Sequence, residues 1–183
     1  MQPFNDTFIK ACLKQKVNHV PVWYMRQVGR YQPEYRKIKE TNSLLDIVHQ
    51  PELCAEITKL AVEQLNVDAS ILFSDIMVPL GPMGIKYDIV ENRGPVLEKP
   101  FRTAADINNL RAIEPEQDLP YVIETIKILK QNLHVPLIGF TGAPFTLASY
   151  MIEGAPSRDY LRTKEMMYSA PDVWHTLMEK LGD

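Results

Sequence analysis

The sequence has little cysteine and lacks the spacings that make a disulfide framework or a zinc site. Its 183 residues include two cysteines, Cys12 and Cys54, and neither belongs to a C-x-x-C pair. The four histidines are scattered, with no H-x-x-x-H pair. We therefore predict no metal site and no disulfides, and two lone thiols favour a reducing compartment.

Long apolar runs and an excess of one charge are absent as well. No stretch approaches the roughly 18 apolar residues that a membrane helix needs. The first residues, "MQPFNDTFIKACLKQK", have the pattern of a polar, amphipathic helix and not of a signal peptide. The formal net charge of −3 lacks the basic surplus that is typical of nucleic-acid binders. We expect a cytoplasmic protein with neither nucleic acid nor a membrane as its partner.

The motifs that hold nucleotides or activate a serine are also missing. The sequence contains no G-x-x-x-x-G-K-[ST], no G-x-G-x-x-G and no G-x-S-x-G. A phosphate-binding loop and a nucleophile elbow are therefore not predicted.

Short apolar runs alternate with longer amphipathic ones, which indicates strands that alternate with helices. The runs 21–25, 69–74 and 135–140 predict strands buried on both faces. Helices are predicted at 51–65, 118–131 and 143–154, and across 163–183 with a break at Pro171. Residues 81–101, rich in glycine and proline, indicate an extended excursion or a hairpin.

This alternation favours an α/β fold with a parallel sheet. A doubly wound sheet and part of a (β/α)₈ barrel both fit the pattern. The chain, at 183 residues, is too short to close a whole barrel, which takes roughly 250 residues.

Two arginines follow the first predicted strand, in the stretch "PVWYMRQVGRYQPEYR". In parallel α/β folds functional groups gather beyond the carboxyl ends of strands, so Arg26 and Arg30 suit a carboxylate-rich ligand. Gly29 is expected to give the turn a backbone conformation closed to other residues. The alternative is that both arginines pair with surface acids such as Glu34 or Glu40.

Asp75 and Tyr150 follow the other two predicted strands. Asp75 comes directly after "ILFS", where a carboxylate either caps a helix together with Ser74 or serves as a functional acceptor. Tyr150 lies in the predicted helix 143–154, where it is either a core tyrosine or a hydrogen-bond donor in a site. The residues alone therefore indicate an α/β chain with a site for an anionic small molecule.

Three stretches together resemble the uroporphyrinogen decarboxylase family. "PVWYMRQVGRYQPEYR" resembles the family's N-terminal signature, apolar residues followed by R-Q-A-G-R-Y-x-P-E. "ILFSDIMVPLGPMG" resembles its aspartate-bearing strand end, and "GFTGAPFTLASYMIEG" resembles its G-x-x-G-x-P-x-T-L-x-x-Y segment. Val28 stands where the signature has alanine, which is a small change in volume.

The resemblance implies a (β/α)₈ TIM barrel that forms a homodimer and needs no metal or organic cofactor. It implies decarboxylation of the four acetate side chains of uroporphyrinogen III to methyls, giving coproporphyrinogen III in haem biosynthesis. Asp75 would accept the pyrrole N–H groups and stabilise positive charge during catalysis, and Arg26 would take part in catalysis. Tyr150 would donate a hydrogen bond, and Arg26, Gln27, Val28, Gly29 and Arg30 would line the substrate-binding loop.

The resemblance covers only the N-terminal half of the family's chain. We therefore expect residues 1–183 to form a single domain, a partial barrel, with little activity in isolation. Two alternatives stay open. One is a cobamide-dependent methyltransferase of the same fold, which binds zinc through its second half. The other is a non-catalytic, truncated binding module.

Overall fold

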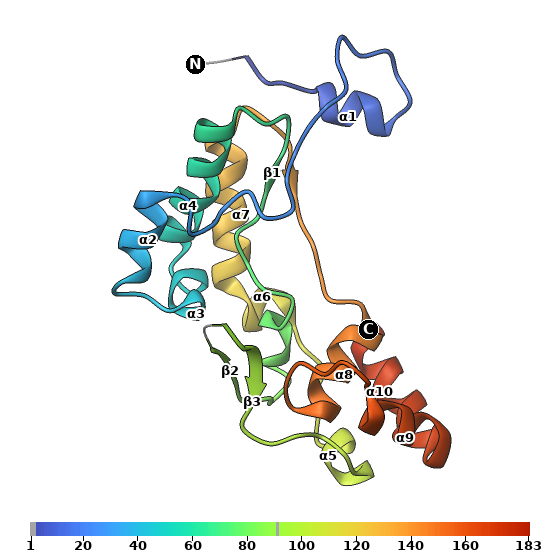
Figure 1. Cartoon of the computed structure of the whole chain (residues 1–183). Coiled ribbons are helices and arrows are strands. Elements are labelled where there is room, and N and C mark those ends of the chain that lie inside the picture. Colours follow the sequence, from blue (N-terminus) through green and yellow to red (C-terminus); the bar gives the residue numbers. More distant parts are fainter. Residues whose placement is uncertain (1–2, 91) are drawn as a thin grey trace. The chain divides into compact units, whose positions relative to one another are not determined.

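A computed structural model describes residues 3–90 and 92–183, and the chain divides into two compact units (Figure 1). Unit 1 comprises the residues up to Ser74 together with Pro120–Phe140. Unit 2 comprises Asp75–Leu119 and Thr141–Asp183. Among the residues described, no helix is both long enough and apolar enough to cross a membrane.

Unit 1 combines five helices with a small parallel sheet, counted over its described residues. The helices are α1 (Thr7–Cys12), α2 (Pro33–Lys39), α3 (Leu44–Val48), α4 (Pro51–Leu65) and α7 (Pro120–Asn132). The strands are β1 (Ser70–Ile71) and β4 (Leu137–Ile138), which pair in parallel with Ser70 opposite Leu137. The sequence predicted a parallel sheet without a strand order, and these two segments pair in parallel as that sheet requires.

Helix α4 has the bounds that the sequence predicts. Pro51 occupies a first-turn position, where its missing N–H is not needed, and Asn66 ends the helix in the left-handed conformation at φ 50°. Its face with Ile57 and Ala61 is fully buried. Figure 1 shows α4 beside α7, and Ala55 of α4 forms a core cluster with Leu129 of α7. The amphipathic pattern therefore predicted the helix, and of the residues that it placed on the buried face, Ile57 and Ala61 are buried.

The strand predicted at 21–25 is wrong. This segment forms no strand, and its side chains are not buried: Val22 is 45% exposed, Tyr24 53% and Met25 76%. The Val22 N–H donates to the carboxylate of Asp68 at 2.8 Å, so a side chain takes the place of a neighbouring strand. The apolar composition indicated an extended backbone, but it could not reveal which group the backbone would bind.

The other two predicted strands are shorter than expected. The segments 69–74 and 135–140 contain β1 and β4, which have two residues each. The helix predicted at 118–131 begins at Pro120, and the N-terminal helix covers Thr7–Cys12 only. Met1 and Gln2, which belong to that predicted helix, lie outside the described residues.

Unit 2 contains a hairpin, one short helix before it and further helices after it. The short helices are η1 (Val78–Leu80), α5 (Ala104–Asn108) and α6 (Pro115–Asp118), and the longer ones are α8 (Pro144–Glu153), α9 (Leu161–Ser169) and α10 (Pro171–Gly182). The strands β2 (Tyr87–Val90) and β3 (Gly94–Leu97) pair antiparallel. The predicted hairpin is confirmed, as is the helix break at Pro171.

Helix α8 has the caps that its sequence predicts. Pro144 lies in its first turn, and Gly154 ends it at φ 81° with its N–H bound to the carbonyl of Tyr150 at 2.8 Å. Met151 and Ile152 are fully buried in the main core cluster of unit 2. The Leu97 N–H donates to the Gly154 carbonyl at 2.8 Å, which fixes the end of α8 against β3.

Helices α2, α3, α5 and α6 were not predicted, although two of them carry a sequence signal. Ser43 and Asp46 form a capping box at the start of α3, and Thr103 and Asp106 form another at the start of α5. A serine or threonine three residues before an acid is a recognised start signal. These helices have four to seven residues, too few for the apolar periodicity to stand out.

Candidate substrate-binding site

The arginine loop, residues 26–32, is held by two buried glutamines. Gln27 and Gln32 are each 1% exposed. The Gln27 amide is satisfied when its oxygen accepts from the Ile71 N–H at 3.2 Å and its nitrogen donates to the Tyr24 carbonyl at 3.2 Å. This side chain therefore fastens the loop to β1.

Gln32 fastens the second half of the loop. Its side-chain oxygen accepts from the Gly29 N–H at 3.0 Å, and its nitrogen donates to Gln64 of α4 at 3.0 Å. The Tyr31 hydroxyl donates to the Gln27 carbonyl. Buried polar groups with both partners in place restrict a loop to one conformation. The arginine loop is therefore a rigid part of unit 1.

Gly29 is needed for space and not for a left-handed turn. The prediction of a special backbone conformation is wrong, because Gly29 is not among the described glycines with positive φ. A Cβ at this position would lie 3.2 Å from two ring carbons of Tyr31. Glycine thus lets the Tyr31 ring pack against the loop backbone. Val28, beside it, packs against the cluster around Tyr35.

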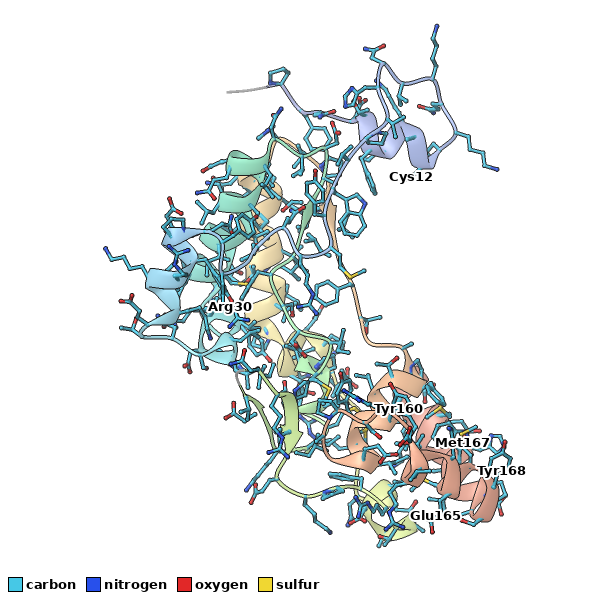
Figure 2. All side chains as sticks on the ribbon, viewed as in Figure 1. Cys12, Arg30, Tyr160, Glu165, Met167 and Tyr168 are labelled. Atoms are coloured by element: carbon cyan, nitrogen blue, oxygen red, sulfur yellow. The ribbon has the colours of Figure 1, made fainter. Side chains whose placement is uncertain are left out.

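Both arginines of the loop are exposed. Among the described residues, no carboxylate lies within 4.0 Å of Arg26, so pairing with Glu34 or Glu40 is wrong for this residue. Arg30 is labelled in Figure 2, and its carbonyl accepts from Arg36 at 2.8 Å. Burial raises the pKa of the Tyr35 hydroxyl, and the positive charge of Arg30 opposes that rise.

Asp75 opens unit 2 and shapes the turn before η1. One of its carboxylate oxygens accepts from the Met77 N–H at 2.9 Å, and its carbonyl accepts from the Val78 N–H at 3.2 Å. Asp75 is half-buried. A local structural role for this carboxylate is thus present, while its role toward a substrate stays a prediction.

Tyr150 lies on α8 and lines a hollow of about 130 Å³ in unit 2. Its half-buried ring packs against the main core cluster of the unit, and its hydroxyl makes no hydrogen bond to the residues that the structure describes. The hollow is lined by Phe145, Thr146, Ser149, Tyr150, Ala155, Pro156, Ser157 and Tyr160. Tyr160, labelled in Figure 2, adopts the left-handed conformation at φ 51°.

The hollow is rich in hydroxyl groups and lacks charged side chains. It is smaller than the roughly 300–1,000 Å³ of pockets that enclose drug-sized ligands. Its size suits one side arm of a larger molecule. The Ser149 hydroxyl already donates to the Phe145 carbonyl at 2.8 Å, and the Ser157 hydroxyl oxygen accepts from the Tyr160 N–H at 3.1 Å, so the hydroxyls of Thr146, Ser157 and the two tyrosines are the available donors.

The predicted site residues fall into the two units. Arg26, Gln27, Val28, Gly29 and Arg30 share one loop of unit 1, while Asp75 and Tyr150 belong to unit 2. Ile76, next to Asp75, packs against the same core cluster as Tyr150. A single hollow shared by all seven stays a prediction. Among the described residues, no group of three His, Cys, Asp or Glu side chains is placed to hold a metal ion.

Sequence reasoning missed two polar residues that support the loop. Gln32 gave no signal, because a glutamine before a proline is typical of an exposed turn. Asp68 is 8% exposed and lies two residues before β1. The only available signal was a charged residue at the edge of an apolar run.

Known proteins resemble this chain from end to end. A sequence model of the uroporphyrinogen decarboxylase (URO-D) family matches residues 3–183. Uroporphyrinogen decarboxylase from Bacillus subtilis is 60% identical over 183 residues, which is 100% of this chain and 52% of the relative. The protein of that name from Halalkalibacterium halodurans is 59% identical over 180 residues, covering 98% of this chain and 52% of its own length.

A solved structure shares the fold. A methyltransferase from Methanosarcina mazei superposes with a TM-score of 0.75 and covers 99% of this chain and 52% of its own, at 20% sequence identity. The predicted class, an α/β fold of the TIM-barrel family of which this chain covers about half, is confirmed. The chain spans about half the length of the curated relatives that it matches, and it belongs to the uroporphyrinogen decarboxylase family.

Proposed function

We propose that this chain is part of a uroporphyrinogen decarboxylase, which converts the four acetate side chains of uroporphyrinogen III to methyls and yields coproporphyrinogen III. The observation that carries the proposal is the 60% identity to a protein of that name over the whole of this chain. The arginine loop, which bears the family's most specific motif, lies within that match.

The arginine loop binds the acidic rim of the substrate. Arg26 and Arg30 are exposed on a loop whose backbone is held by the buried side-chain amides of two glutamines. The backbone positions of both arginines are therefore fixed, while their guanidinium groups lie at the surface. A planar guanidinium holds a carboxylate through two parallel N–H bonds. A substrate with eight carboxylates offers such partners all around its ring. Gln27 is buried, and its side-chain amide supports this loop through hydrogen bonds to the backbone of Ile71 and Tyr24.

Asp75 binds the pyrrole N–H groups at the centre of the substrate's ring. An ionised carboxylate only accepts hydrogen bonds and has about four acceptor sites, so its bond to the Met77 N–H is compatible with further donors. The inward-pointing pyrrole N–H groups are such donors. When a ring carbon is protonated the pyrrole becomes positive, and a nearby carboxylate lowers the energy of that state before carbon dioxide leaves. Tyr150 donates its hydroxyl to an acidic side arm in the hollow that it lines.

The two rival functions have less support. The methyltransferase likeness, at 20% identity, concerns the fold alone. A non-catalytic binding module has no observation of its own in its favour. The same resemblance leads us to infer that the complete protein is a homodimer that works in the cytoplasm without a cofactor. The two free thiols suit a reducing compartment.

The test uses a joined protein, in which residues 1–183 are followed by the remaining half of the Bacillus subtilis relative. We expect it to form coproporphyrinogen from uroporphyrinogen. Arg26→Gln and Arg30→Gln should each lower kcat/KM by about 10- to 100-fold, the value of a hydrogen bond between charged groups.

Lys37→Gln provides the matched control, because Lys37 is an exposed cation on α2 close to the loop in sequence. Its kcat/KM should equal that of the unaltered joined protein. A folded joined protein that forms no coproporphyrinogen would refute the proposal. Arginine variants that turn over as fast as the lysine variant would remove the role assigned to the loop.

A further inference from the structure

One buried carboxylate, Asp68, gathers three donors from the N-terminal segment. Its Oδ1 accepts from the Asn5 side-chain amide at 2.9 Å and lies 2.8 Å from Nε2 of His19. Its Oδ2 accepts from the Val22 N–H at 2.8 Å. The residue is only 8% exposed. Three residues that precede Asp68 by 63, 49 and 46 positions in the sequence thus bind its side chain: Asn5, His19 and Val22.

The backbone strengthens this attachment. The Asp68 N–H donates to the Val22 carbonyl at 2.8 Å, so Val22 is bound to Asp68 through both its N–H and its C=O. The Asn5 N–H donates to the carbonyl of His134, which precedes β4. The N-terminal segment is therefore fastened to the residues that lead into both strands of unit 1.

A second attachment lies five residues further along. In the amide orientation that satisfies both of its polar atoms, Gln27 accepts from the Ile71 N–H of β1. The segment between Val22 and Gln27 is thus held at both ends, at Asp68 and at Ile71. This segment contains Arg26 and leads directly to Arg30. In place of a full strand ladder, one backbone bond from the Asp68 N–H and the side chains of Asp68 and Gln27 hold this segment.

The electrostatics agree with a carboxylate that stays charged. Burial alone raises the pKa of Asp68, but the hydrogen bonds from Val22, Asn5 and His19 outweigh it and hold the pKa below its usual range. A buried carboxylate that loses one of its hydrogen-bond donors costs free energy. The bonds of Asp68 to Asn5, His19 and Val22 therefore support one another.

We propose that Asp68 is a positioning residue, whose carboxylate sets the place of the arginine loop by holding Val22 and the N-terminal segment against the start of β1. The inference rests on the proposed function, in which Arg26 and Arg30 bind an acidic substrate. Asp68 acts on the substrate only through that loop and does not contact it.

Hydrogen exchange on the chain tests the attachment without any substrate. In Asp68→Asn the amide of Val22 loses a charged acceptor, and its exchange should become about tenfold faster or more. Peptides from α4 and α7 should exchange as before. Asp6→Asn is the matched control, since Asp6 is an acid of the same segment whose side chain, 49% exposed, pairs with Lys10. Unchanged exchange at Val22 in Asp68→Asn would overturn the proposal.

Kinetics of the joined protein test the consequence for the site. Asp68→Asn should raise KM for uroporphyrinogen by about tenfold with little change in kcat, because misplaced arginines weaken binding before chemistry. Asp6→Asn should leave both constants unchanged. A fall in kcat with KM unchanged would contradict a positioning role through the arginines.

Two further results keep the inference separate from the proposed function. If Arg26→Gln and Arg30→Gln leave kcat/KM unchanged, the proposed function of the loop fails, while the exchange result at Val22 still decides the attachment. If Asp68→Asn loosens α4 and α7 as well, Asn5→Ala and His19→Ala each remove one donor and leave the carboxylate. Faster exchange at Val22 in these two variants, with α4 and α7 unchanged, supports the attachment, and normal exchange at Val22 refutes it.

Discussion

Gly142, in the motif "GFTGAPFTL", shows how closely single residues pack at the start of α8. A Cβ at this position would lie 2.5 Å from Cδ2 and 2.8 Å from Cγ of Leu147, and 3.2 Å from Cβ of Ile76. Gly139, three residues earlier in the same motif, has no atom within 4 Å of its own hypothetical Cβ. Space requires glycine at position 142 but not at position 139, and the sequence alone does not reveal this difference.

These two glycines form a matched pair for mutation. Gly142→Ala should lower the free energy of unfolding by about 1–3 kcal/mol, the cost of forcing an extra methyl group into a filled space. Gly139→Ala should be neutral or slightly stabilising, because alanine restricts the unfolded chain. Urea unfolding followed by tryptophan fluorescence, to which Trp174 of unit 2 contributes, measures the first change. Equal effects of the two substitutions would show that the crowding at Gly142 is not real.

The two cysteines differ in their surroundings and should differ in reactivity. Cys12 is exposed, while Cys54 is buried and its thiol donates to the Phe73 carbonyl at 3.1 Å. Burial raises the pKa of the Cys54 thiol to about 11, which leaves little of the reactive thiolate at pH 8. A disulfide-exchange reagent should therefore modify one thiol per native chain, and two in urea. Rapid modification of native Cys12→Ser would contradict this picture.

At the scale of elements, the sequence predicted best where local signals decide the outcome. Helices α4 and α8 followed from periodicity and caps, and the hairpin β2–β3 from its turn residues. The segment 21–25 was mistaken for a buried strand because pairing depends on a distant partner, Asp68, that no local pattern reveals. The residues of the candidate site were named from strand ends and family motifs, while the buried supports Gln32 and Asp68 were missed.

The start of α5 offers a test of a single capping box. Asp106 accepts from Lys99 at 2.7 Å and from the Thr103 hydroxyl at 2.8 Å. These bonds, together with the Arg102 and Thr103 N–H groups, hold the pKa of Asp106 well below its usual range. A depressed carboxyl pKa stabilises the fold above the pKa of the unfolded chain, about 3.9, and the gain is lost as the pH falls through the lower folded value.

Asp106→Asn should therefore lower the free energy of unfolding by about 1 kcal/mol at pH 7, and by progressively less below pH about 4. Urea unfolding of Asp106→Asn and of the unaltered chain, at pH 7 and below pH about 4, measures the loss of unfolding free energy at each pH. Asp159→Asn is the control, because Asp159 is an exposed acid of the same unit and should show no such dependence. A loss that stays constant down to acid pH would indicate that the charge of Asp106 contributes nothing.

At the scale of the whole molecule, the chain corresponds to about half of its relatives. It contains the arginine loop, Asp75 and Tyr150, which are the groups proposed to bind the substrate and to stabilise charge. The resemblance assigns further site groups to the second half of the family's chain. We therefore expect residues 1–183 alone to form little or no coproporphyrinogen, and the joined protein to restore turnover.

The most direct test of the account replaces Asp75 by asparagine in the joined protein, which keeps the shape of the side chain and removes its charge. The account predicts that uroporphyrinogen still binds while kcat falls by about 100-fold or more, the loss expected when a group that stabilises developing charge is removed. Binding is measured by quenching of tryptophan fluorescence, and turnover by the coproporphyrinogen formed. Turnover equal to that of the unaltered joined protein would contradict the role assigned to Asp75.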